Sequence, residues 1–301
     1  MFYDLNVQWT SATDPELPRT LAFLAELGYD VVALNHTFSG KLPPELACPI
    51  PSPLPFPVPK NLTILRRLTL PLTSPLSNAR LKSLSASYDL LALRPTDEKT
   101  LQACCSTLDA DIVSLDLSQR FGFPFKFKPL SEGVKRGVRI EVCYSQGVSG
   151  DPNARRNVIS NCTSLIRASR GRGLMVASEA RRAVECRGPW DVVNLLAVWG
   201  LSQDRAYEAV SKEARSVVVM AGLKRSGYRG VVDVVYGGED TQKADDVQDK
   251  DKVVKTNGEK ANGAKRKAEE LKSTPAKEGQ PMSKRQMKRN AKAAREAANA
   301  A

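Results

Sequence analysis

The chain has 301 residues, a formal net charge of +12 and a hydrophobic fraction of 42%, which is enough for a sizeable buried core. It contains no run of about 18 apolar residues, and its first residues lack the basic and apolar regions of a signal peptide. We therefore expect no membrane span and no secretion. The six cysteines form no Cys-x-x-Cys pair, which favours buried thiols in a reducing compartment over a disulfide framework or a zinc site.

The positive charge is concentrated in one part of the chain. Residues 121–187 contain 13 basic and 5 acidic side chains, a net charge of +8, whereas the rest of residues 1–236 sums to −1. A near-neutral body with one strongly basic region is typical of a surface that meets phosphate groups. A soluble enzyme could also show such a charge distribution by chance.

Short β-branched or alternating runs recur along the chain and alternate with helical patterns. Strands are expected near Phe2–Trp9, Asp30–His36, Leu62–Leu72, Tyr88–Leu93, Asp111–Leu117, Val138–Tyr144, Leu174–Ala177 and Ser216–Met220. Apolar residues at helical spacing predict helices over Leu17–Leu27, Asp97–Leu108 and Pro152–Ser169. Strands that alternate with helices predict a parallel sheet, and eight of them predict a TIM-barrel-like (β/α) barrel. An open doubly wound sheet is the alternative.

Two segments depart from this alternation. Residues 43–59 contain eight prolines and predict an extended surface loop, as a spacer or, alternatively, as a recognition segment for a partner. From Gly237 the chain is rich in Lys, Glu, Ala and Asp, which predicts a disordered tail over residues 237–301 after a barrel domain over residues 1–236.

The tail itself carries clusters of basic residues. Ala264–Lys267 and Lys284–Arg285 are candidate nuclear-localisation or RNA-contacting patches, and the last 20 or so residues have good helix propensity. A solvated tail without such a role is the alternative.

Residues for hydrolytic or redox catalysis are scarce. His36 is the one histidine, and Asp116 and Glu179 are the acidic residues that could join it around a metal at strand ends. The sequence has no His-x-His, His-Glu-x-x-His or Gly-x-Ser-x-Gly motif, so a structural histidine is the favoured interpretation. Gly171 and Gly173 precede the predicted strand instead of following it, which excludes a dinucleotide-binding loop.

Arginines are the stronger candidates for a binding site. The candidate RNA-binding residues are Arg155, Arg156, Arg167, Arg170, Arg172, Arg181, Arg182 and Arg187. On the helix over residues 152–169 and directly after it, four of these residues fall within an arc of about 120° beside the apolar face: Arg155, Arg156, Arg167 and Arg170. A guanidinium group forms two parallel hydrogen bonds to phosphate oxygens and stays charged at any relevant pH. Converging arginines therefore predict a binding site for a polyanion. Surface ion pairs with Glu179 and Glu185 are the alternative.

The segment after the last of these arginines has the pattern of two short helices. Pro189 is expected to begin the first, Gly200 to end it and Ser202 to cap the second, which leads into the predicted strand Val217–Met220. The apolar stripe of the first helix is formed by Trp190, Val193 and Leu196. We interpret this block as structural, and we expect Trp190 to be a core residue.

Several of these segments resemble one known family, the thirty-kilodalton protein subunit of ribonuclease P and ribonuclease MRP. The resemblance rests on Met1–Val7, on Gly28–His36 and above all on Arg187–Leu195, followed by Gly200–Ser202 and Ala206–Ser211. It extends to about residue 222 and does not include the proline-rich insert or the tail.

The resemblance implies a barrel related to metal hydrolases of the polymerase and histidinol phosphatase type. Those relatives carry His-x-His at the end of the first strand, where this chain reads Asp4-Leu5-Asn6-Val7-Gln8. The departure agrees with the scarcity of catalytic residues, so we expect no catalytic residue, no metal site and no cofactor held by the protein. The catalytic Mg²⁺ is expected on the partner RNA.

The resemblance further implies a non-catalytic, RNA-binding role in a ribonucleoprotein that removes the 5′ leader from precursor tRNA and acts in rRNA processing. The expected partners are ribonuclease P/MRP RNA, precursor tRNA and other protein subunits, in the nucleus and in particular the nucleolus. The alternative is a self-sufficient metal-dependent phosphoesterase on the same barrel. A third reading is a protein–protein adaptor that does not contact RNA.

Overall fold

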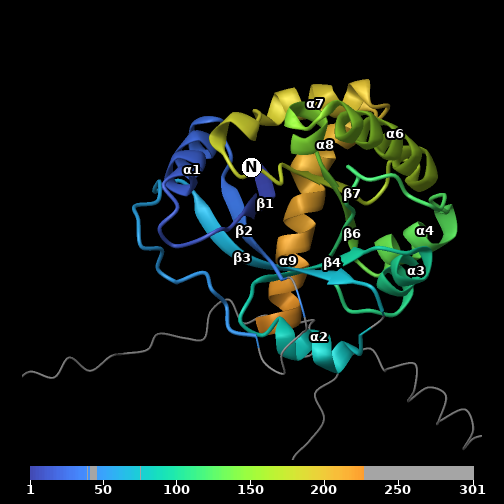
Figure 1. Cartoon of the computed structure of the whole chain (residues 1–301), viewed down its shortest axis with the longest axis horizontal. Helices are drawn as coiled ribbons and strands as arrows, with labels where there is room; N and C mark the ends of the chain where they lie inside the picture. The colour runs from blue at the N-terminus through green and yellow to red at the C-terminus, as the bar shows by residue number, and fades with distance from the viewer. Residues whose placement is uncertain (39, 41–45, 75, 227–301) are drawn as a thin grey trace, which may run out of the picture. The chain divides into compact units, whose positions relative to one another are not determined.

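The structure is a computed structural model that describes residues 1–38, 40, 46–74 and 76–226. Within these residues, seven parallel strands form the centre of the protein (Figure 1). The strands are β1 (Tyr3–Gln8), β2 (Val31–Thr37), β3 (Thr63–Leu72), β4 (Leu90–Pro95), β5 (Ile112–Ser114), β6 (Arg139–Cys143) and β7 (Leu174–Ala177). They pair in chain order from β1 to β7. The chain divides into two units, Met1–Glu239 and Asp240–Ala301, and all the described strands and helices belong to the first.

The first and last strands meet, so the sheet closes on itself. Just beyond β7, Ala180 forms a parallel bridge with Val7, and its carbonyl accepts a hydrogen bond from the Gln8 N–H at 2.9 Å. The Glu179 N–H donates to the Asn6 carbonyl at 2.8 Å. This closure confirms the TIM-barrel-like fold, built with seven strands in place of eight, and excludes the open sheet.

Helices surround the ring of strands. They are α1 (Glu16–Glu26), α2 (Asn78–Leu84), α3 (Glu98–Ser106), α4 (Phe127–Lys135), α5 (Ser145–Ser149), α6 (Pro152–Ser169), the 3₁₀ turn η1 (Ala183–Glu185), α7 (Pro189–Val198), α8 (Gln203–Val210) and α9 (Lys212–Ser226). The three helices expected from spacing are present, and Asp151 caps α6 through a bond from the Ala154 N–H. In the part of the chain that the structure describes, no helix is long and apolar enough to cross a membrane.

The predicted eighth strand over Ser216–Met220 is wrong, because this segment lies within α9. Its run of valines favours a strand locally, but the burial pattern has helical spacing. Val217 and Ala221 are 1% exposed, whereas Val219 is 50% exposed. Packing of one helical face therefore overrides the β propensity of the valines.

Helix α9 crosses the end of the barrel at which the strands begin (Figure 1). Its buried residues pack on inward-facing residues of the strands, including Tyr3, Leu5, Val31, Ala33, Leu90, Ala92, Ile112 and Met175. Lys224 and Arg225 form ion pairs with Asp111, just before β5, at 3.0 and 2.9 Å, and Glu213 pairs with Arg139 at the start of β6. The helix thus closes the base of the barrel.

The proline-rich insert packs partly on the core. Residues 46–59 form neither helix nor strand, as expected, but their apolar side chains alternate with exposed prolines. Ile50 is 2% exposed, and Leu54, Phe56 and Val58 are half-buried against the main core. The described part of the insert is therefore more than a spacer; residues 43–45 and the predicted tail lie outside the described residues.

The backbone of Arg187, at the start of the block interpreted as structural, is held by two tyrosine side chains, in agreement with a structural role. The Arg187 carbonyl accepts a hydrogen bond from the Tyr29 hydroxyl, and its N–H donates to the Tyr144 hydroxyl, both at 3.0 Å. The expectation for Trp190 is wrong: its side chain is 58% exposed and stacks on Tyr207, with ring centroids 5.4 Å apart.

Among the six cysteines, all free, five are buried and Cys48 is half-buried.

The helical nature of α9 can be tested with two identical substitutions. Val217→Ala removes a buried side chain and should lower the free energy of unfolding by about 2 kcal/mol, whereas Val219→Ala should change it by less than about 0.5 kcal/mol. In a strand the two residues would share one face and respond alike. Equal losses in urea unfolding would contradict the helix.

Candidate nucleic-acid interface

An ion pair crosses the interior of the barrel. Arg67 on β3 and Glu141 on β6 both have fully buried side chains, and the Arg67 Nη2 donates to the Glu141 Oε2 at 2.6 Å. The Arg67 Nη1 donates to the second carboxylate oxygen and to the Leu5 carbonyl. Burial alone would raise the pKa of Glu141, but the guanidinium group lowers it below its usual value. The pair therefore stays ionised.

Neutral polar side chains complete the hydrogen bonding around this pair. Asn35 donates to Asn6 at 2.8 Å, and Thr69 donates to Asn35 at 2.7 Å. The Asn6 amide reaches Glu141 at 3.3 Å. The inward-facing positions at which a barrel enzyme would place catalytic groups are thus occupied by side chains that bond to one another.

A second ion pair lies toward the mouth of the barrel, the end at which the strands finish. Arg94 on β4 donates to Glu179 at 2.6 Å and to Ser114 at 3.1 Å. Glu179 follows β7 with a φ of 59°, a left-handed conformation that is unfavourable for a residue with a side chain. The geometry holds its carboxylate against Arg94.

The three residues considered for a metal site are not brought together. The His36 Nδ1 lies 2.7 Å from the Tyr88 hydroxyl, and the rings stack. His36 points away from the barrel interior, because its neighbour Asn35 points into it. Asp116 bonds to nearby loop residues and Glu179 to Arg94. Among residues 1–38, 40, 46–74 and 76–226, no cluster of His, Cys, Asp and Glu has the arrangement of a metal site.

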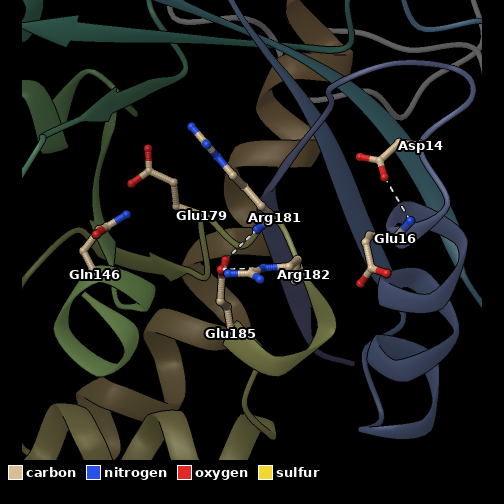
Figure 2. A pocket seen from close by; sticks show the side chains of 7 residues that line it. All are labelled: Asp14, Glu16, Gln146, Glu179, Arg181, Arg182 and Glu185. Atoms are coloured by element: carbon tan, nitrogen blue, oxygen red, sulfur yellow. Dashed lines mark hydrogen bonds and ion pairs between the residues drawn. The ribbon is translucent and has the colours of Figure 1, made fainter. Parts of the chain in front are cut away.

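The mouth contains an open pocket of about 540 Å³. It is lined by Asp14, Glu16, Gln146, Glu179, Arg181, Arg182 and Glu185 (Figure 2). Arg182 lies 3.6 Å from Glu185, whose carboxylate also accepts the Arg181 N–H at 2.8 Å. The pocket is therefore a mixed-charge surface and not a purely basic one.

Seven of the eight candidate arginines form two groups instead of one. Arg155, Arg156, Arg181 and Arg182 follow the ends of β6 and β7 and lie at the mouth; we call them the mouth arginines. Arg187 lies farther along the chain, and its backbone bonds to the hydroxyls of Tyr29, just before β2, and of Tyr144, just after β6. Arg167, Arg170 and Arg172 lie between the last turn of α6 and the start of β7; we call them the base arginines. Since α6 is about 27 Å long, the predicted convergence of all eight arginines is wrong.

Most of these arginines have no acidic partner. All except Arg187 are exposed. Within the described residues, Arg182 is the only one of the eight whose guanidinium group lies within 4 Å of a carboxylate. The guanidinium groups of Arg155 and Arg187 donate to backbone carbonyls. The alternative of surface ion pairs therefore accounts for one of the eight.

Sequence reasoning missed an aromatic residue beside the base arginines. The Arg170 guanidinium lies over the Phe127 ring, 4.5 Å from its centroid, and Phe127 is 43% exposed. Phe127 belongs to a stretch in which phenylalanines alternate with other residues, three of them basic, from Arg120 to Lys128. This alternation of aromatic and basic residues was the available signal.

Comparison with known proteins identifies the family, since the model of the RNase P subunit p30 family matches residues 1–226. The chain belongs to this family. It is 41% identical over 234 residues to the probable ribonuclease P protein subunit 3 of Schizosaccharomyces pombe, covering 77% of this chain and 98% of the relative. It is 33% identical to ribonuclease P protein subunit p30 of Mus musculus (70% and 82% covered) and to the ribonuclease P/MRP protein subunit RPP1 of Saccharomyces cerevisiae (82% and 92%).

A solved structure supports the fold. One chain of a cryo-EM structure of archaeal ribonuclease P with mature tRNA superimposes with a TM-score of 0.59 at 12% sequence identity. The match covers 79% of this chain and 99% of the archaeal chain. The two chains therefore share the barrel fold over nearly the whole of the archaeal chain.

Removing one partner of the buried ion pair should destabilise the fold more than removing both partners. Arg67→Met leaves the Glu141 carboxylate buried without a cation and should lower the free energy of unfolding by about 3–5 kcal/mol. Adding Glu141→Leu removes the unpaired charge and should restore much of the loss. If chemical denaturation shows the double variant to be as unstable as Arg67→Met, the cost does not arise from the uncompensated charge.

A second buried carboxylate makes stability depend on pH. Asp4 is 1% exposed, and its Oδ1 accepts hydrogen bonds from two backbone N–H groups. Its Oδ2 has no hydrogen-bond partner among the residues that the structure describes. Burial raises the pKa of Asp4 to about 6. Between about pH 4 and 6 the folded state therefore binds more protons at Asp4 than the unfolded state does. Proton binding at Asp4 thus stabilises the folded state at low pH, and this contribution is lost as the pH rises through 6.

We expect Asp4 to make the protein about 1 kcal/mol more stable at pH 5 than at pH 7. Asp4→Asn should remove this contribution, because an amide does not titrate. Urea unfolding of both proteins at the two pH values gives the difference. Identical pH dependence in the two proteins would show that Asp4 does not titrate in this range.

Proposed function

We propose that this protein is an RNA-binding, non-catalytic subunit of ribonuclease P or ribonuclease MRP that supports 5′-leader removal from precursor tRNA. Membership of the p30 family supports the assembly. The observation that carries the RNA-binding role is the set of base arginines, which are exposed and have no carboxylate within 4 Å among the described residues. Unpaired guanidinium groups are suited to bidentate contacts with phosphate oxygens.

The interior of the barrel supports the absence of catalysis by the protein itself. Arg67 and Arg94 place fixed cations where a barrel hydrolase would hold its metal, and both are already paired with carboxylates. Catalytic Mg²⁺ would accordingly be held by the partner RNA. The wider expectations of a role in rRNA processing, of partner subunits and of a nuclear, in particular nucleolar, location are part of the same proposal.

The rival function is a self-sufficient phosphoesterase. The full-length protein alone should not hydrolyse phosphate esters or precursor tRNA in the presence of Mg²⁺, Mn²⁺ or Zn²⁺. Metal-dependent turnover that is lost in His36→Ala, in a protein that remains folded, would support the rival and overturn the proposal.

The base arginines should determine the salt dependence of RNA binding. Each phosphate contact that is lost reduces the slope of log K against log salt by roughly 0.7–0.9. Replacing Arg167, Arg170 and Arg172 together with glutamine should therefore flatten the slope by about two units, and the fold should survive because the three side chains are exposed. Filter binding of a precursor tRNA over a series of salt concentrations measures the slope.

The matched control replaces Arg156, Arg181 and Arg182 at the mouth with glutamine, which removes the same charge. We expect a smaller change, because Arg182 is already paired with Glu185. Flattening in the mouth variant alone would move the RNA site to the mouth. An unaltered slope in both variants would exclude the arginines as the RNA site.

A further inference from the structure

The segment before α4 holds a set of aromatic rings in fixed positions. Phe121, Phe123 and Phe125 contact one another edge to face, with centroids 5.2–6.1 Å apart, and all three pack partly buried on the main core. The residues that alternate with them are exposed, Arg120 and Lys126 among them. The partly buried rings thus anchor a loop that carries Arg120 and Lys126 on its outer surface, where Lys126 pairs with Glu98 at 2.6 Å.

Phe127 differs from the other three phenylalanines. It is 43% exposed, and one face of its ring is covered by the Arg170 guanidinium. Arg170 ends α6 in a left-handed conformation with a φ of 56°, an unfavourable conformation for a residue other than glycine. Loop and helix end therefore combine to hold two planar groups, one aromatic and one cationic, in contact at the surface.

Such a pair matches the chemistry of an unpaired nucleotide. Bases stack on aromatic rings and on guanidinium planes, and phosphates bind neighbouring cations. Arg167 and Arg172 flank Arg170, and Lys128 follows Phe127; all three are exposed and have no ion pair among the described residues. In a duplex both faces of each internal base are already stacked, so an aromatic ring offers it little.

We propose that Phe127 and Arg170 form a stacking site for an unpaired RNA base, with the flanking phosphates bound by Arg167, Arg172 and Lys128. This inference rests on the proposed function, since it specifies the kind of RNA that the base arginines bind. It assigns two roles to neighbouring residues: the cations supply affinity for any RNA, and the ring selects single-stranded RNA.

The two roles can be separated by substitution in the full-length protein. Phe127→Leu keeps an apolar side chain and all charges but removes the ring. It should weaken binding of a short single-stranded RNA about tenfold, the effect of losing one stacked base. Binding of the same strand annealed to its complement should be unchanged, and the salt slope should be unchanged for both. Phe127→Trp should retain single-strand binding.

Tyr207→Leu is the matched control, because Tyr207 is 41% exposed and its ring packs with the rings of Trp190 and Phe2. It should bind both RNAs as the unaltered protein does. Thermal unfolding of each variant verifies that the fold is intact. A single-stranded RNA with one 2-aminopurine reports stacking directly, since its fluorescence should be quenched by the unaltered protein and recover in Phe127→Leu.

The outcomes distinguish this inference from the proposed function. If the triple base-arginine variant flattens the salt slope but Phe127→Leu binds both RNAs normally, the stacking site is wrong and RNA binding stands. Equal weakening of single-stranded and duplex binding by Phe127→Leu also overturns the stacking site. If neither RNA binds in a salt-dependent manner, the proposed function itself fails. If RNA binding is normal but Phe127→Leu releases another protein subunit from the purified complex, the surface docks protein instead.

Discussion

The buried ion pair between Arg67 and Glu141 constrains how the strands of the barrel are placed relative to one another. It joins β3 to β6 through the centre of the barrel, with both side chains fully buried. Each charge would be strongly destabilising alone, so the two strands must keep their positions for the pair to form. This pair and its hydrogen-bonded neighbours fill inward-facing positions of the barrel, and the proposed RNA contacts lie on the outer surface.

Both ends of the barrel reflect the same division between a closed interior and a charged exterior. At the base, α9 covers the opening with an apolar face and fixes itself through Asp111, Arg139 and their partners. At the mouth, Arg94 and Glu179 neutralise each other, and the pocket beyond them has mixed charge. The unpaired positive charge lies instead on exposed arginines around α6, where a polyanion can reach it.

The sequence contained most of the fold, because alternation and helical spacing are local properties. The seven strands and α6 follow from such patterns, whereas the valines of α9 adopt a helix only because the barrel base offers an apolar surface to one face. The prediction that Trp190 is a core residue failed for a similar reason, because its apolar character does not reveal that it stacks on Tyr207 at the surface. The candidate arginines were identified from their residue type and their angle around α6. A helical projection ignores the distance along the helix axis, so it placed arginines from opposite ends of α6 in one group.

The central claim is that the outer surface around the end of α6, and not the barrel interior, contacts RNA. Ultraviolet crosslinking of the assembled ribonucleoprotein, purified through the full-length chain, followed by mass spectrometry of the crosslinked peptides, tests it most directly. We predict RNA-linked peptides that contain Phe127 or the residues from Arg167 to Arg172, and none from the inward-facing residues of β3 and β6. RNA-linked peptides confined to the mouth pocket, or none in a complex whose other subunits crosslink efficiently, would contradict the account.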